Sequence, residues 1–238
     1  GYNYVAGQRG RGAYVNLKYC TDWRYLSLKS YVRTGNAFGR EMSFDVVPNR
    51  IDPFPYEAFN RSPMALTAVS SDLELGEADY AHVRDARTDL PYVIASSSMP
   101  LVSEIVEADG KKLLDGGTCD SIPVTYSQTT GARKHIVVCT QDVAYQKKPN
   151  KMLTLMRQRY ADYPYFLDRV EMRHFEYNRT SRAVERMHKA GEIFLIRPSK
   201  PVEVSNMEQN QAKLLDLYEQ GVEAAVRAWD ALERYLAR

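Results

Sequence analysis

Apolar and polar positions follow two different periods along the chain. Short runs with the composition of strands cover residues 66–73, 77–83, 106–114, 135–140 and 193–198. Apolar residues at three- and four-residue steps predict helices over residues 162–173, 179–190 and 208–238. Gly76 and the pair Asp109-Gly110 each lie between two strand segments, and Asp-Gly favours a two-residue type I′ turn. Two hairpins are therefore predicted, over residues 66–83 and 106–114.

The continuous apolar run His135–Thr140 is typical of a strand that is buried on both faces of a parallel sheet. Strands also alternate with helices over much of the chain, which favours a parallel arrangement. We therefore predict an α/β fold, a three-layer α/β/α structure with a mainly parallel central sheet. No internal repeat, low-complexity tract or linker interrupts the chain, so residues 1–238 are predicted to form a single domain.

The C-terminal helical segment carries one apolar stripe, formed by Leu215, Tyr218, Val222, Ala225, Trp229, Leu232 and Leu236. Its opposite face carries charges of both signs. Because helices that lie on membranes have a mainly basic polar face, we interpret the stripe as a packing surface.

Composition and charge exclude several classes of protein. The formal net charge of +2 is close to neutral and gives no electrostatic reason to expect nucleic-acid binding. Three cysteines without a Cys-x-x-Cys pair argue against a disulfide framework or a zinc site, and they fit a reducing, cytoplasmic compartment. The four histidines share no metal-ligand spacing, so no metal is expected. No apolar run approaches the ~18 residues that span a bilayer.

Basic residues gather in two places. One group lies near the start, at Arg9, Arg11, Lys18, Arg24, Lys29 and Arg33, and the other lies within residues 146–151. These residues are consistent with solvated faces and a loop, or with peripheral contact to anionic lipid head groups. Both interpretations stay open, and the sequence indicates no particular oligomeric state.

The tripeptide Asp115-Gly116-Gly117 is the most informative motif for chemistry. Alone, Asp-Gly-Gly is usually only a turn, since glycine allows positive φ and aspartate bonds its own backbone. Here it ends the second predicted hairpin, where active sites of open α/β sheets collect. The run Ala95–Pro100, with three serines, precedes it, and Asp120–Pro123 follows it.

Together these motifs resemble the second half of the patatin-like phospholipase family, in its bacterial branch. The resemblance implies a serine acyl hydrolase of Ser-Asp dyad type that acts on lipid or carboxylic esters without a metal or organic cofactor. It implies that Asp115 is the base. The glycines allow the close approach of backbone to substrate that this role needs. The implied active-site loop and wall are Gly116, Gly117, Ser96, Ser97 and Ser98.

The nucleophile motif of that family, Gly-x-Ser-x-Gly, does not occur in the chain. Residues 1–10 resemble the helix that follows the nucleophile in bacterial members, which implies that the serine lies upstream of Gly1. The other interpretation is a plain N-terminal helix closed by Gly7. If the resemblance holds, we expect the isolated chain to be inactive and to expose an apolar seam where the upstream strand belongs.

Two alternatives compete with the hydrolase. One is a catalytically inactive relative that binds lipid or a partner through the same groove, which an upstream sequence without Gly-x-Ser-x-Gly would favour. The other is an unrelated α/β enzyme in which Asp115 belongs only to a turn, which a solvent-exposed Asp115 far from any cleft would favour. Ser97, in the serine run before Asp115, and Ser121, the serine nearest to it in sequence, are candidate nucleophiles within the chain, but neither lies in an elbow motif.

Overall fold

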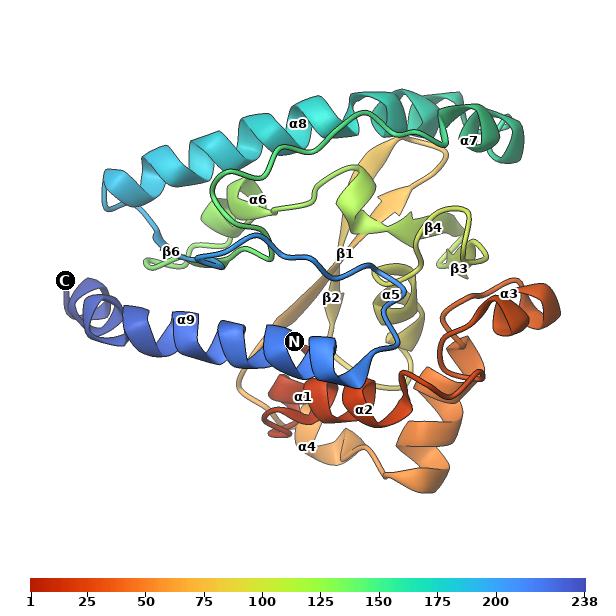
Figure 1. Ribbon diagram of the computed structural model, residues 1–238, viewed down its shortest axis with the longest axis horizontal. Coiled ribbons are helices and arrows are strands. Elements are labelled where there is room, and N and C mark those ends of the chain that lie inside the picture. Colours follow the sequence, from red (N-terminus) through yellow and green to blue (C-terminus); the bar gives the residue numbers. More distant parts are fainter.

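The strands form two separate sheets in the computed structural model, which describes residues 1–238 (Figure 1). The larger sheet has the order β2-β1-β4-β3, and all of its neighbouring strands are antiparallel. The strands are β1 (Leu66–Asp72), β2 (Glu77–Val83), β3 (Val106–Ala108) and β4 (Lys111–Asp115). The smaller sheet pairs β5 (Ile136–Val138) with β6 (Phe194–Ile196) in parallel. The predicted three-layer fold with a mainly parallel central sheet is therefore wrong.

The connections between the strands explain this difference. β1 is joined to β2, and β3 to β4, by short turns, and strands joined in this way can only be antiparallel. Parallel neighbours need a long crossover, and β5 and β6 have one that includes α7 (Leu153–Arg159) and α8 (Pro164–Lys189). β1 and β4 are also far apart in sequence, but they pair antiparallel. The structure is thus mixed α/β, with antiparallel pairing in its larger sheet.

Both predicted hairpins are confirmed. Asp109 has φ of 47° and Gly110 has φ of 76°, so both central residues of the β3–β4 turn are left-handed, as a type I′ turn requires. Gly76, between β1 and β2, has φ of 64°. The local turn residues therefore determine the pairing within each hairpin, whereas the β1–β4 pairing joins the two hairpins over a long stretch of sequence.

The remaining helices are α1 (Tyr2–Val5), α2 (Arg11–Tyr19), α3 (Leu28–Thr34), α4 (Tyr56–Asn60), α5 (Leu90–Ala95), α6 (Val124–Thr129) and α9 (Gln211–Ala237), with a π-helical segment at Met42–Ile51 and a 3₁₀ turn at Gly116–Thr118. Among them, α1, α2 and α4 are grouped together at the lower side of the view in Figure 1, below α9. The two helices predicted over residues 162–190 are one continuous helix, α8. No glycine or proline lies between the two predicted segments, so nothing there breaks the helix.

Helix α8 contributes to the cores beside both sheets. Near its start, Phe166 and Val170 are fully or almost fully buried with Leu73 and Leu114, which come from the larger sheet and its β1–β2 turn. Nearer its end, Val184 is buried in another cluster that includes residues of the β5–β6 region. One rigid element therefore joins the two sheets.

Helix α9 is confirmed, but the predicted packing stripe is not. Tyr218, Val222 and Trp229 of that stripe are exposed, whereas Tyr235 is buried. The Tyr235 hydroxyl accepts the His135 N–H at 3.1 Å, just before β5. Helix α9 therefore contacts the smaller sheet through a different face and leaves an apolar face uncovered.

The β5 strand is also more exposed than its sequence predicts. Val138 is 69% exposed and Ile136 is 45% exposed, so burial on both faces is wrong for this strand. β5 has β6 as its strand partner on one side and no strand on the other. The long helices α8 and α9 both contact β6 and lie on either side of it in Figure 1. None of the helices has the length and apolar composition needed to cross a membrane.

Candidate functional site

Asp115 ends β4, a strand that lies between β1 and β3. The two residues before it, Leu113 and Leu114, have no exposed surface and hold the strand in the core. The Asp115 N–H donates to the Ser98 carbonyl at 2.8 Å, and the Asp115 carbonyl accepts the Ser71 hydroxyl at 2.9 Å. Hydrogen bonds to both its N–H and its carbonyl therefore hold the backbone of Asp115 and fix the position of its Cα atom.

The two glycines after Asp115 are required by close contacts. A Cβ on Gly116 would meet the backbone carbonyl of Val69, and a Cβ on Gly117 would come within 2.8 Å of Asp115 Oδ1. Neither glycine has positive φ, so the need is for space rather than for left-handed backbone. The Gly117 N–H donates to Asp115 Oδ1 at 2.8 Å, which closes a small turn and orients the carboxylate.

The Asp115 carboxylate is mostly buried and has one oxygen without a hydrogen bond. Oδ1 accepts the Gly117 N–H, and no donor bonds to Oδ2. Burial raises the pKa of Asp115, and the Gly117 N–H and the charges of Arg173 and Lys147 partly offset this rise. A carboxylate with a raised pKa and an unoccupied oxygen can accept a proton from a neighbouring hydroxyl group.

The three serines of the predicted wall lie at and after the end of α5. Ser98 contacts Asp115 through its carbonyl, while its hydroxyl donates to Ile94 of its own helix at 2.8 Å. Ser97 is exposed, and its hydroxyl also donates back into α5. Ser96 is half-buried and makes no side-chain hydrogen bond. The structure therefore brings Ser98 to Asp115 and leaves the hydroxyls of Ser96 and Ser97 without a bond to it.

No serine hydroxyl in the chain bonds to the Asp115 carboxylate. Ser121 donates instead to the Gly117 carbonyl at 2.6 Å. Ser70 lies directly across from Asp115 in the β1–β4 register, and sequence reasoning missed it. Its residue is fully buried and its hydroxyl has no partner, so an external ester has no access to it.

Two cations complete the surroundings of Asp115, and the sequence did not identify either of them as a site residue. Arg173 of α8 donates from Nε to the Gly117 carbonyl at 2.6 Å. Lys147 lies in the segment between β5 and α7, and its Nζ is 4.8 Å from the centre of the Tyr177 ring. Lys147 belongs to the basic run 146–151, which was the only sequence signal. Arg173 gave no signal, because 56 residues separate it from Gly117.

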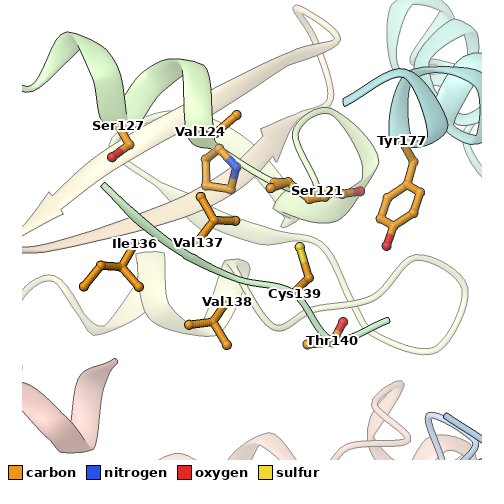
Figure 2. Close-up of a pocket in the computed structure, with 11 residues that line it drawn as sticks. Ser121, Val124, Ser127, Ile136, Val137, Val138, Cys139, Thr140 and Tyr177 are labelled. Carbon is orange, nitrogen blue, oxygen red and sulfur yellow. The ribbon is translucent and has the colours of Figure 1, made fainter. Parts of the chain in front are cut away.

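Two cavities are lined by residues that surround Asp115. One, of about 350 Å³, has mostly hydrophobic lining residues, which come from α6 and the turn before it, from β5 and from Tyr177 (Figure 2). Figure 2 shows Val137 and Cys139 on the α6 side of β5, whereas Val138 points to the opposite side. The other cavity, of about 430 Å³, is lined by residues 145–151 and by α8, including Arg173. Asp115 itself lines neither cavity, but Ser121 of the first and Arg173 of the second both donate to the carbonyl of Gly117, two residues after it.

Comparison with known proteins finds a match for the C-terminal part of the chain. Residues 163–237 match a family described as a domain of unknown function, DUF6363. No curated protein matches the chain. The matched segment contains α8, β6 and α9, so it includes Arg173 and Tyr177, whereas Asp115 lies outside it.

Proposed function

We propose that the chain belongs to a serine acyl hydrolase, a phospholipase or esterase, in which Asp115 is the base of a Ser-Asp dyad. The nucleophile is a serine upstream of Gly1. The observation that carries the proposal is the Asp115 carboxylate itself, which is held by a glycine turn, has a raised pKa and keeps one oxygen free of hydrogen bonds. The motifs around it, described above, resemble those of patatin-like phospholipases.

The proposed reaction needs little from Asp115 beyond position and basicity. The free oxygen of Asp115 takes the proton of the serine hydroxyl while the serine oxygen attacks the ester carbonyl. Asp115 then gives that proton to the alcohol as the alcohol leaves. Asp115 next takes a proton from water, which attacks the acyl-serine, and the same proton passes to the serine oxygen as the acid leaves, so both residues return to their starting states. Because burial raises the pKa of Asp115, the carboxylate is a stronger base than an exposed aspartate. The substrate is a lipid ester or a simple carboxylic ester.

The apolar cavity of Figure 2 supports an acyl substrate. Seven of its eleven lining residues are hydrophobic, and Ser121 joins it to the Gly117 carbonyl beside Asp115. A volume of about 350 Å³ is at the lower end of the range of ligand pockets, and it fits a short or medium acyl chain.

The exposed edge of β5 supports the proposal that another strand pairs there. Unpaired strand edges with apolar side chains associate with other strands. We expect the 238-residue protein to self-associate as its concentration rises, and Val138→Lys to reduce that association, because a charge on an edge strand opposes pairing. Sedimentation velocity over a concentration series measures both.

Val143→Lys is the matched control for this prediction. Val143 is 66% exposed, close to the 69% of Val138, but it lies outside the strand. A wild-type protein that stays monomeric at every concentration, or equal effects of the two substitutions, would contradict the role of the β5 edge.

The test of the proposed function begins with the coding sequence upstream of Gly1. If it encodes Gly-x-Ser-x-Gly, the extended protein is expected to hydrolyse p-nitrophenyl esters, and the 238-residue chain alone is expected to be inactive. An upstream sequence without that motif would instead favour a catalytically inactive protein that binds lipid or a partner through the same groove. Ester hydrolysis by the verified 238-residue chain would show that a different serine is the nucleophile.

A further inference from the structure

The cavity between residues 145–151 and α8 is built from cationic side chains. Four of its ten lining residues are lysine or arginine, Lys147, Lys148, Lys151 and Arg173, and none is acidic. A concave surface lined by one sign of charge concentrates ions of the other sign. The cavity therefore favours an anionic ligand.

Two of these cations are held in place by contacts other than ion pairs. Arg173 is anchored through its Nε to Gly117, and its other guanidinium nitrogens make no hydrogen bond. The backbone of Lys147 is bonded twice to the Asn178 side chain, at 2.8 and 3.0 Å. Neither Lys147 nor Arg173 takes part in any ion pair of the structure. Both positive charges are therefore available to a ligand.

The two cations also repel each other in a half-buried environment. Burial and the charge of Arg173 lower the pKa of Lys147 to about 8, and Asp115 only partly offsets this. The Asp115 carboxylate thus interacts with two cations, Lys147 and Arg173, and these three groups together carry an excess of positive charge. A second anion in the cavity would relieve the repulsion and raise the pKa of Lys147 again.

We propose that this cavity binds a phosphate group, with Lys147 and Arg173 as its ligands. The free edge of a guanidinium matches two phosphate oxygens, and a lysine ammonium adds a point charge. We assign this phosphate to the ester substrate because Arg173, which lines the cavity, donates to the Gly117 carbonyl near Asp115. This assignment rests on the proposed function. The substrate would then be a phosphate-bearing ester, with its acyl group toward the apolar cavity.

The first test titrates the 238-residue protein with inorganic phosphate at constant ionic strength. The Lys147 pKa, measured by NMR of ¹³C-dimethylated lysines, is expected to rise from about 8 toward the ordinary lysine value of about 10.4 when phosphate binds. Chloride is expected to leave it unchanged. A Lys147 pKa that does not respond to phosphate would overturn the proposal, and this measurement needs no variant.

Variants assign the ligands. Lys147→Gln and Arg173→Gln are each expected to weaken phosphate binding by about 10- to 100-fold, the effect of losing a charge-assisted hydrogen bond. Lys189→Gln and Arg182→Gln, both exposed on α8, are the matched controls and are expected to have no effect. Equal effects of the control substitutions would contradict a localised site.

Further measurements distinguish a lipid head group from a free phosphate ester, and they test the phosphate site separately from the proposed hydrolase function. Tighter binding to phosphatidic acid vesicles than to glycerol 3-phosphate would assign a lipid head group, and the reverse order would assign a free phosphate ester. Phosphate binding at Lys147 by a protein without esterase activity would retain the site and reject the proposed function. Esterase activity without phosphate binding would support the proposed function and reject the phosphate site.

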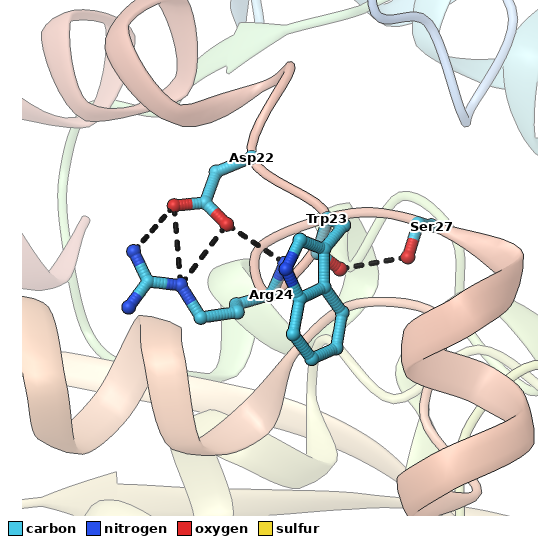
Figure 3. A network of polar contacts seen from close by, with 4 residues as sticks. All are labelled: Asp22, Trp23, Arg24 and Ser27. Carbon is cyan, nitrogen blue, oxygen red and sulfur yellow. Dashed lines mark hydrogen bonds and ion pairs between the residues drawn. The ribbon is translucent and has the colours of Figure 1, made fainter.

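A separate surface near the N-terminal end of the chain has the features of a lipid-binding tip. Figure 3 shows the turn before α3, in which the Asp22 side chain bonds to Arg24 and the Ser27 hydroxyl donates to the Trp23 carbonyl at 2.7 Å. Ser27 also accepts the Ser30 N–H and so caps α3. These bonds hold Trp23 against the start of the helix.

Helix α3 presents cations and apolar side chains beside Trp23. Lys29 Nζ is 4.1 Å and Arg33 Cζ is 5.1 Å from the Trp23 ring centre, and neither side chain forms an ion pair. Leu28 is 72% exposed and Val32 is 78% exposed, one turn apart. The helix contains no acidic residue. In Figure 1, α3 lies at one end of the molecule, away from α8 and α9.

From this independent observation, we infer that α3 and Trp23 contact an anionic lipid bilayer. Exposed aliphatic side chains enter the acyl boundary, the indole lies at the interface, and the two cations meet lipid phosphates. Charge complementarity selects a lipid surface over an apolar protein partner, because Lys29 and Arg33 flank the aliphatic pair without counter-ions.

Vesicle co-sedimentation tests this inference. Binding is expected with phosphatidylcholine vesicles that contain phosphatidylglycerol, and Lys29→Gln with Arg33→Gln is expected to weaken it about 30-fold. Leu28→Ser with Val32→Ser is also expected to weaken it. Val222→Ser with Val226→Ser, an exposed pair at the same spacing on α9, is the control. Equal binding to neutral and anionic vesicles, or equal loss in the control, would overturn the inference.

Discussion

Asp115→Asn is expected to lower kcat/KM for ester hydrolysis by about 10²- to 10⁴-fold in the protein that includes the upstream serine, because it removes the general base. Asparagine has nearly the same shape and can still accept the Gly117 N–H, so the turn is expected to survive. In the wild type, the rate is expected to fall as the pH falls through the Asp115 pKa, because only the ionised carboxylate accepts a proton. Burial moves that midpoint above the ordinary aspartate value of about 3.9.

The free energy of unfolding of Asp115→Asn shows whether a loss of activity comes from the missing base or from a loss of folding. A raised pKa means that the charged carboxylate is less favourable in the folded than in the unfolded protein, so Asp115 lowers stability as the pH rises through its two pKa values. Asp115→Asn removes that charge and is therefore expected to leave the free energy of unfolding at pH 7 unchanged or increased. Activity should fall while urea unfolding shows an intact protein.

Asp109→Asn is the matched control, at the other end of the same strand pair. Asp109 lies at the hairpin tip with φ of 47°, a conformation that asparagine adopts readily. Its carboxylate accepts the Tyr92 hydroxyl, which an amide oxygen can also do. Full activity is expected. If Asp115→Asn keeps its activity, or if both variants lose it equally, Asp115 is not the base.

Phe166→Ala is expected to lower the free energy of unfolding by about 3–5 kcal/mol. Phe166 has no exposed surface and lies edge-on to Tyr160, with ring centres 5.4 Å apart. Its removal leaves a cavity where α8 contacts Leu73 and Leu114, so the contact between helix and sheet is lost together with buried apolar area. Urea unfolding followed by circular dichroism measures the change, and a single transition is expected because one core contains both elements.

Phe175→Ala provides the same substitution on an exposed part of the same helix. Phe175 is 51% exposed, so its replacement is expected to change stability by less than about 0.5 kcal/mol. A small effect of Phe166→Ala, or two separate unfolding transitions, would mean that α8 and the larger sheet do not share a cooperative core.

The predictions succeeded where the determining physics is local. The β3–β4 hairpin follows from Asp109-Gly110, because the turn needs positive φ at two successive residues and few pairs allow it. Helix α9 follows from its apolar period, but the side that packs depends on which neighbours meet it. Tyr235 turns toward the backbone before β5, and this contact is invisible in the sequence.

The predictions failed where distant segments decide the outcome. Alternation of strands and helices suggested a parallel sheet, yet four strands form two tight-turn hairpins that join through antiparallel β1 and β4, and the only parallel pair is β5–β6. At the candidate site, Asp115 could be identified from its own motif and flanking residues. Arg173 could not, because its position beside Gly117 results from the packing of Phe166 and Val170 earlier in the same helix.

The helix that bridges the two sheets has a consequence for gene architecture. Phe166 and Val170 bury one face of α8 against the larger sheet, and Arg173 reaches the turn after β4, so the matched segment 163–237 is incomplete alone. Expressed without the rest of the chain, this segment would expose that apolar face, and Arg173 would lose its hydrogen bond to the Gly117 carbonyl. We therefore expect this segment to be inherited together with a strand equivalent to β4, and recombination between them to be disfavoured across genomes.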